Sequence, residues 1–167
     1  WEQFENKPKE FTIQTSPITT SRQRLMSDLP ESGLLLENST PTNQFYDVAG
    51  RRALFMGKEN GGIDELWVHP YKVMYQYQAG IVLGDTVAWL NQFPVSVQVR
   101  PVSIKRTYAT PLGTIKEIVF SSLWKAGGIV HYQCAQPTQL VIRCKSDLRW
   151  MWPYDMNALG DLYYAYD

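Results

Sequence analysis

The stretch GGIVHYQCAQPTQLVIRCKSDLRWMWPY, residues 127–154, decides the predicted fold class. It contains two strand-like runs, 129–134 and 139–144, on either side of a Gln-Pro-Thr break. We expect these two runs to form a hairpin. Strands with this apolar content bury one face against a second layer of sheet. The stretch therefore predicts an all-β fold in which at least two sheets pack together.

Short runs of strand-like sequence, separated by turn residues, recur along the rest of the chain. No long amphipathic helix interrupts them. The Asn60-Gly61 pair is a strong hairpin signal. Val95, Val97 and Val99 share one face of their run. The expected strands are 11–15, 53–56, 63–68, 71–77, 81–83, 86–90, 95–101, 103–109, 114–121, 129–134, 139–144 and 162–167, and the run 34–36 is apolar but short.

This number of short strands predicts an antiparallel two-sheet β-sandwich, and a closed barrel is the less favoured alternative. The 167 residues suit one domain, and we expect residues 1–167 to form a single sandwich. The chain carries 16 basic and 16 acidic residues, so its charge draws it neither to nucleic acid nor to an anionic membrane. No apolar run approaches the roughly 20 residues of a membrane span. We therefore expect neither a nucleic-acid nor a membrane partner.

The two cysteines, Cys134 and Cys144, lie one on each strand of the expected hairpin. With a turn centred on residues 137–138 they are not directly opposite each other. A disulfide requires Cα atoms within about 7 Å. We expect two free and mostly buried thiols.

Catalytic motifs are absent from the sequence. His69 and His131 are the only histidines, and no nucleophile elbow accompanies them. Structural zinc requires closely spaced Cys/His pairs, which the chain lacks. Asp64 and Glu65 are adjacent, so a regular strand would point them to opposite faces, unlike the carboxylate pair of a glycosidase. We expect no catalytic residue, no metal ligand and no cofactor, although a calcium site built from loop carboxylates remains open.

Aromatic residues are the remaining candidates for a binding site, and they fall into two alternating sets. The first, if the backbone stays extended through Pro70, is Trp67, His69 and Tyr71. The second is Trp150, Trp152 and Tyr154. Because residues 145–149 are polar, we expect the chain to leave the sheet edge before the second set. Either set could stack on a sugar or pack this domain against a neighbour.

Three segments resemble a known kind of domain: GKENGGIDELWVHP (57–70), IKEIVF (115–120) and DLRWMWPY (147–154). Over roughly residues 50–167 the order of strands and turns resembles the N-terminal β-supersandwich of bacterial glycoside hydrolases and glycogen-debranching-like proteins. In that family the sandwich precedes an (α/α) barrel that carries the acid and base carboxylates. The resemblance implies a non-catalytic accessory role here, with the downstream catalytic domain of the same protein as partner.

Two alternatives stay open beside this hypothesis. One is an independent carbohydrate-binding module that uses an aromatic platform to hold a glycan. The other is a self-contained sandwich enzyme, such as a lyase or an epimerase. The chain begins with Trp1 and ends in the strand-like run 162–167, so we expect a piece of a longer protein. For this protein we expect a periplasmic or extracellular location.

Overall fold

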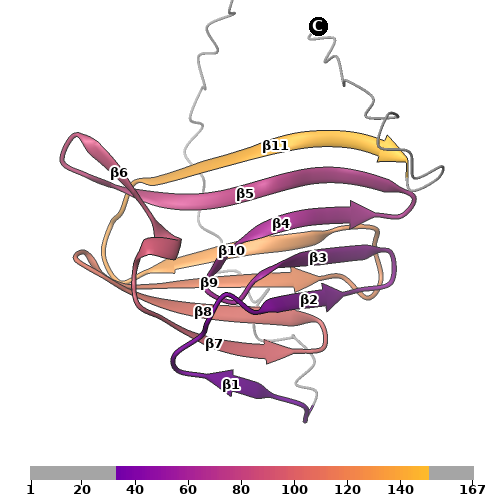
Figure 1. Cartoon of the computed structure of the whole chain (residues 1–167), viewed down its shortest axis with the longest axis horizontal. Helices are drawn as coiled ribbons and strands as arrows, with labels where there is room; N and C mark the ends of the chain where they lie inside the picture. The colour runs from indigo at the N-terminus through magenta and orange to yellow at the C-terminus, as the bar shows by residue number, and fades with distance from the viewer. Residues whose placement is uncertain (1–32, 151–167) are drawn as a thin grey trace, which may run out of the picture. The chain divides into compact units, whose positions relative to one another are not determined.

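The computed structural model describes residues 33–150, which form eleven strands in two antiparallel sheets (Figure 1). The five-stranded sheet has the order β1 (Leu36–Asn38), β7 (Val95–Arg100), β8 (Ser103–Thr110), β9 (Gly113–Ser121), β10 (Gly128–Cys134). The six-stranded sheet has the order β11 (Leu140–Trp150), β5 (Tyr71–Leu83), β4 (Gly61–Val68), β3 (Ala53–Lys58), β2 (Phe45–Ala49), with β6 (Thr86–Trp89) paired to β5. Within these residues the one helical element is the 3-10 turn η2 (Leu90–Gln92).

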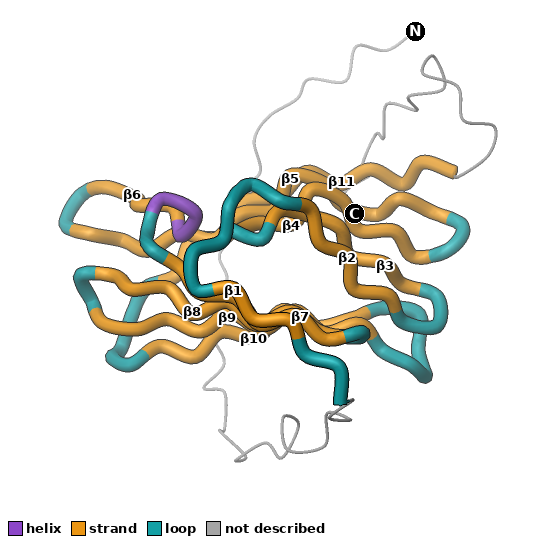
Figure 2. Tube along the Cα trace, turned by 60° about the horizontal axis from the view of Figure 1, so that its bottom comes forward, coloured by secondary structure: helices purple, strands orange, loops and turns teal. Residues whose placement is uncertain are grey.

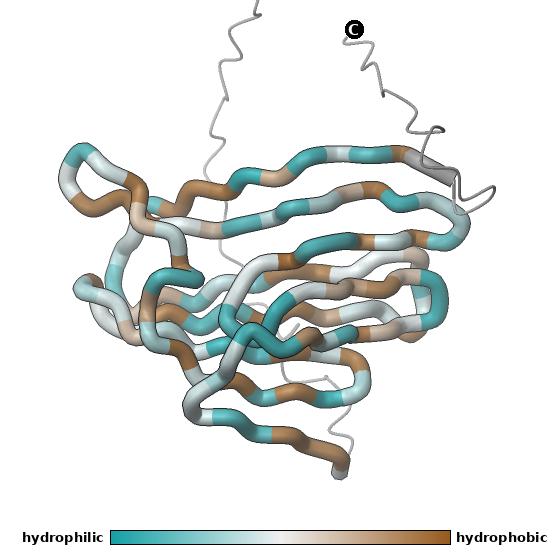
Figure 3. Tube along the Cα trace, in the orientation of Figure 1, coloured by the Kyte–Doolittle hydropathy of each residue, from teal (hydrophilic) through white to brown (hydrophobic). Residues whose placement is uncertain are grey.

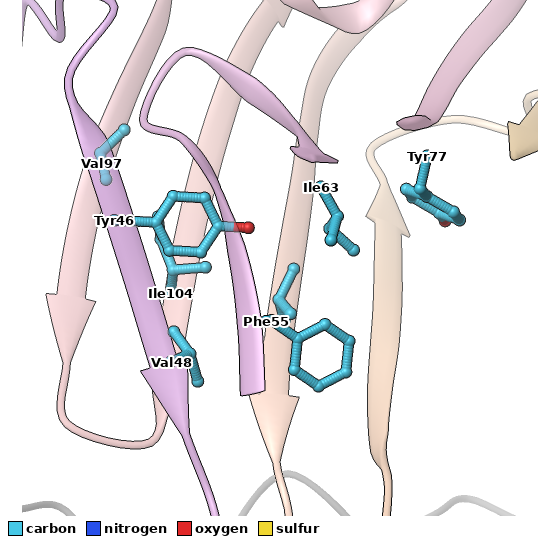
Figure 4. Close-up of a cluster of buried hydrophobic side chains, with 8 residues drawn as sticks. Tyr46, Val48, Phe55, Ile63, Tyr77, Val97 and Ile104 are labelled. Atoms are coloured by element: carbon cyan, nitrogen blue, oxygen red, sulfur yellow. The ribbon is translucent and has the colours of Figure 1, made fainter. Parts of the chain in front are cut away.

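The predicted fold class, an all-β antiparallel two-sheet sandwich, is confirmed. Figure 2 shows the two layers of strands, and β2 packs on β8 and β9 while β3 packs on β9. Hydrophobic and hydrophilic residues alternate along several strands (Figure 3), as expected when one face of a sheet is buried. The main core lies between the sheets, and Figure 4 shows seven of its eight members labelled. They are Tyr46, Val48, Phe55, Ile63, Tyr77, Val97, Ile104 and, unlabelled, Val119.

Several local predictions are confirmed by the strand register. β3 and β4 form a hairpin in which Lys58 pairs with Gly61, around the Asn-Gly turn. β8 pairs with β9 from Ser103–Phe120 to Thr110–Gly113, as the run 103–121 predicts. The alternating valines of β7 all contact the core. Gly61 and Gly62 adopt φ values of 143° and 83°, so the turn needs residues that tolerate positive φ.

The expected hairpin of 129–134 with 139–144 is wrong. β10 pairs with β9 in the five-stranded sheet, whereas β11 pairs with β5 in the six-stranded sheet. The Gln-Pro-Thr segment between them carries the chain from one layer to the other. Alternation along a strand specifies which face is buried, but it does not specify the neighbouring strand, because every antiparallel partner satisfies the same pattern.

Residues 145–149 do not leave the sheet, contrary to the sequence prediction. They continue β11 as far as Trp150, with two register shifts. Lys145 and Ser146 are exposed and Asp147 is half-buried, and such polar side chains fit an edge strand. The prediction of free thiols is confirmed, and the reason is that the two cysteines lie in different sheets. Cys134 is half-buried but Cys144 is exposed, so the expected burial holds only in part.

A buried ion pair occupies the space between the sheets. Arg106 on β8 is 0% exposed and its Nη1 donates to Oε1 of Glu117 on β9, which is 2% exposed. The guanidinium also crosses to the other sheet. Its Nη2 donates to the carbonyl oxygens of Lys58 at 2.7 Å and Gly62 at 3.1 Å, and its Nε donates to that of Glu59 at 3.0 Å. One side chain thus fixes the β3–β4 turn against the opposite sheet.

Tyrosine hydroxyls extend this network through the interior. Tyr132 on β10 donates to Oε2 of Glu117 at 2.8 Å, and its hydroxyl lies 3.0 Å from that of Tyr77 on β5. Burial and then the charge of Glu117 raise the pKa of Tyr132, so it remains a neutral donor at physiological pH. Burial acts most strongly on Arg106 and acts to lower its pKa, but the interactions with Glu117, Tyr46 and Tyr108 together outweigh burial, and the pKa lies above its usual value. Arg106 therefore keeps its charge between the sheets, where it holds β8, β9 and the β3–β4 turn together.

Replacing Arg106 with methionine should lower the free energy of unfolding by about 3–5 kcal/mol, because Glu117 would keep a buried charge without its partner. Urea unfolding followed by circular dichroism measures the change. The matched control is Lys105→Met, the preceding residue of β8, which is only half-buried and should change stability by less than about 0.5 kcal/mol.

A second variant separates the ion pair from the turn contacts. Arg106→Met with Glu117→Leu removes both charges, yet three carbonyl oxygens of the β3–β4 turn still lose their donor. We expect this double variant to remain less stable than the unaltered chain. Full recovery of stability would show that the contacts to the turn contribute nothing.

Candidate binding site at one end of the sandwich

The first aromatic set does not lie along one extended strand. The His69–Pro70 peptide bond is cis, and the chain reverses there from β4 into β5. Trp67 is opposite Lys72, and Val68 is opposite Tyr71. The expectation of one continuous aromatic face is therefore wrong, because the backbone does not stay extended through Pro70. The turn nevertheless brings Trp67, His69 and Tyr71 to the same end of the six-stranded sheet.

Trp67 is only 8% exposed, and its indole is fixed by hydrogen bonding. Its Nε1 donates to Oε2 of Glu65 at 2.7 Å, and Lys72 Nζ donates to Oε1 of the same carboxylate at 2.8 Å. Lys72 Nζ also lies 3.7 Å from Oδ2 of Asp147 on β11. Two carboxylates thus neutralise a lysine whose side chain is 8% exposed, as a buried ammonium requires. This arrangement orients Trp67.

A hollow of about 470 Å³ lies beside Trp67 at this end. Leu54 and Met56 of β3 contribute apolar walls, and Arg51, Arg52 and His69 contribute polar groups from the two neighbouring turns. The complete lining is Ala49, Gly50, Arg51, Arg52, Ala53, Leu54, Met56, Trp67 and His69. An apolar hollow with a few polar groups has the composition of a small-molecule site or of an anchor pocket at an interface.

The turns around the hollow are tied to one another. Arg52 Nη2 donates to the carbonyl oxygen of His69 at 3.2 Å, which joins the β2–β3 turn to the β4–β5 turn. The amide of Arg51 donates to the carbonyl oxygen of Ser122 at 3.1 Å, which joins it to the β9–β10 connection of the other sheet. A Cβ atom at Gly50 would overlap that Ser122 oxygen, so the close approach requires glycine.

The sequence interpretation missed Trp124, which is 84% exposed in the β9–β10 connection. The hydroxyl of Ser122 accepts hydrogen bonds from the amides of Trp124 at 3.2 Å and Lys125 at 3.0 Å, so the turn that carries them is ordered. The available signal was the Leu123-Trp124 pair between Ser122 and Gly127, where a connection between strands is usually polar. An exposed ring on an ordered turn is typical of an interaction surface.

The second aromatic set falls mostly outside the described residues. Trp152 and Tyr154 lie outside them, as do the run 162–167 and the run 11–15. Trp150 is the last residue of β11, where its backbone pairs with Tyr71. The end of β11 is therefore next to the β4–β5 turn. The expected contact surface at Trp150 stays a prediction.

A second hollow, of about 660 Å³ and polar, lies on the six-stranded sheet where β4, β5 and β11 meet. Asp64, Gln78 and Arg143 contribute to it, and Arg143 Nη2 donates to Oε1 of Gln78 at 2.5 Å. The guanidinium of Arg143 also lies 3.9 Å from the ring of Trp89. Asp64 thus lines this hollow, whereas Glu65 binds Trp67 and Lys72.

Within residues 33–150 no group of three or more His, Cys, Asp or Glu side chains is placed to hold a metal ion. The two histidines belong to different sheets, His69 beside β4 and His131 on β10. The part of the chain that is described also has no helix long and apolar enough to cross a membrane. This end of the sandwich therefore combines an apolar hollow lined by Arg51, Arg52 and His69 with the exposed indole of Trp124.

No protein-family model, curated protein or solved structure matches the chain. The interpretation of the site therefore depends on its own residues.

The two tryptophans of this end should respond differently to truncation. Trp124→Ala should change the free energy of unfolding by less than about 0.5 kcal/mol, since the exposed ring contributes little to the fold. Trp67→Ala should cost about 3–5 kcal/mol because it empties a packed position. Denaturant unfolding of both variants measures the difference. A large loss for Trp124→Ala would contradict its assignment as a surface residue.

Proposed function

We propose that this chain is a non-catalytic accessory β-sandwich of a larger carbohydrate-active protein. Its partner is the catalytic domain of the same protein, which docks against the end of the sandwich that carries Trp124. The resemblance to the N-terminal supersandwich of glycoside hydrolases supports the protein class. A periplasmic or extracellular location is part of the same proposal.

The observation that carries the docking role is that the turn bearing Trp124 and Lys125 is joined through Ser122 to the turn bearing Arg51 and Arg52, two arginines that also line the apolar hollow. Tryptophan and arginine are the residues most enriched among those that dominate interface energies. The turns that bear them are joined by backbone hydrogen bonds across both sheets. Such a surface loses little conformational freedom when it binds, which favours affinity.

The charged groups of the described region support a structural role over a catalytic one. Arg106 and Glu117 are paired inside the core, and Glu65 is occupied by both Trp67 and Lys72. A general base needs an accessible group whose protons can be exchanged with a substrate. The ion pairs instead hold the strands and turns in place beneath the docking end.

The docking role predicts a stability effect that appears only in the longer protein. Trp124→Ala with Arg51→Ala should lower the midpoint of thermal unfolding when the catalytic domain is present, because the interface between the domains loses its anchors. The same double variant should leave this chain unchanged when it is expressed alone. Differential scanning calorimetry of all four proteins tests this. Equal midpoints for variant and parent in the longer protein would contradict the docking role.

A second candidate function, glycan binding, is favoured by the hollow beside Trp67. Its apolar walls and the hydrogen-bonding groups of Arg52 and His69 match the two kinds of surface on a sugar. In this case isothermal titration with oligosaccharides would detect binding that Arg52→Ala weakens at least tenfold. Trp124→Ala, outside the hollow, would leave it unaltered. Binding with that pattern, and no domain coupling, would replace the accessory role by that of a carbohydrate-binding module.

A further inference from the structure

The polar hollow of the six-stranded sheet lies where β5 departs from regular pairing with its edge neighbour β11 (Figure 1). Arg143 of β11 is opposite Gln78, and Lys145 is opposite Tyr75, so two residues of β5 stand opposite the single residue Cys144. This irregularity is a β-bulge, and bulges are frequent beside functional sites because they re-aim side chains. The hollow measures about 660 Å³, which is within the usual range of small-molecule sites.

Gln76, one of the two bulged residues, has a strained backbone. Its φ is 51°, and among residues 33–150 it is the only residue other than glycine with a positive φ. Such a conformation costs free energy, and residues that adopt it cluster at functional sites. Gln76 lines the hollow together with Gln78. The strained bulge thus places two residues with amide side chains along the hollow.

The guanidinium of Arg143 is held in position beside the hollow. Its Nε and Nη2 both donate to Oε1 of Gln78, at 3.1 Å and 2.5 Å, and its Cζ lies 3.9 Å from the centre of the Trp89 ring. Within residues 33–150 its Nη1 makes no hydrogen bond, so this atom can donate to a ligand. A guanidinium that is already oriented loses little freedom when it binds a carboxylate.

The hollow also carries three charged side chains that no salt bridge neutralises. Arg143, Lys145 and Asp64 line it, and within the described part of the chain none of them is paired with an opposite charge. Lys72 and Arg106, in contrast, are each paired with a carboxylate. Two cations against one carboxylate leave the lining with an excess positive charge, which favours an anionic ligand.

From this geometry we propose that the polar hollow binds a sugar acid. Arg143 and Lys145 hold its carboxylate, because charge-assisted hydrogen bonds from cations to carboxylates are the strong ones. Asp64 accepts hydrogen bonds from its hydroxyl groups, and the amides of Gln76 and Gln78 donate to them or accept from them. A bare anion such as phosphate would gain nothing from Asp64, and a neutral sugar would not use the excess positive charge. The proposal goes beyond the docking role and does not depend on it.

Isothermal titration of this chain with glucuronate and with glucose tests the proposal, because the two sugars differ only in having a carboxylate or a hydroxymethyl group. Glucuronate should bind about tenfold more tightly than glucose, and also more tightly than inorganic phosphate. Arg143→Gln should weaken the binding of glucuronate about tenfold, since it removes one charged donor. The matched control is Lys116→Gln, which removes an exposed positive charge from β9 in the other sheet and should leave binding unaltered.

Cys144 provides a second readout of a ligand in this hollow. It is exposed and lines the hollow, whereas Cys134 is half-buried on β10 of the other sheet. Bound glucuronate should slow the alkylation of Cys144 by iodoacetamide and leave that of Cys134 unchanged. Mass spectrometry of the two cysteine peptides measures both rates. Arg143→Gln should remove the protection, and circular dichroism verifies that the variants are folded.

Three results would overturn the proposal. The first is that glucuronate gives neither a heat of binding nor protection of Cys144 in the unaltered chain. The second is that glucose or phosphate binds as tightly as glucuronate, which would make the hollow a neutral-sugar site or a plain anion site. The third is that Lys116→Gln weakens binding as much as Arg143→Gln, which would reduce the effect to net charge. Each of these results leaves the docking role of the end that carries Trp124 untouched, since that role is measured in the longer protein.

Discussion

The buried pair of Arg106 and Glu117 is the interaction on which the rest of the structure depends. Three constraints meet at this guanidinium: the carboxylate of β9, the ring of Tyr46 at 4.7 Å, and the carbonyl oxygens of the β3–β4 turn. A charge between two sheets is tolerated only when its hydrogen bonds are satisfied. Satisfying them requires one relative position of the sheets. Apolar packing alone would permit neighbouring registers, because valines and isoleucines interdigitate in several ways.

This fixed position of the sheets has a consequence at the proposed docking surface. It places the β9–β10 connection against the β2–β3 turn, so that Trp124 and Arg51 lie on one end of the molecule. A different relative position of the sheets would not give the same grouping of turns. The docking surface therefore follows from the interior and not from the surface residues alone.

Much of the fold could be predicted from the sequence, because alternation and turn residues act locally. The Asn60-Gly61 hairpin and the pairing of β8 with β9 are examples. Long-range partners were harder to predict, as the runs 129–134 and 139–144 illustrate by entering different sheets. Arg106 escaped notice because an arginine in a strand usually faces solvent, and nothing local marks one that faces inward. The bent course at His69–Pro70 and the exposure of Trp124 likewise depend on tertiary contacts.

The central claim is that the end bearing Trp124 is a docking surface for another domain of the same protein. Hydroxyl-radical footprinting of Trp124 tests it most directly, because oxidation of an indole reports its access to solvent. The account predicts rapid oxidation of Trp124 in this chain alone and strong protection in the longer protein that contains it, with Trp67 slow in both. Equal oxidation of Trp124 in the two proteins would contradict the claim.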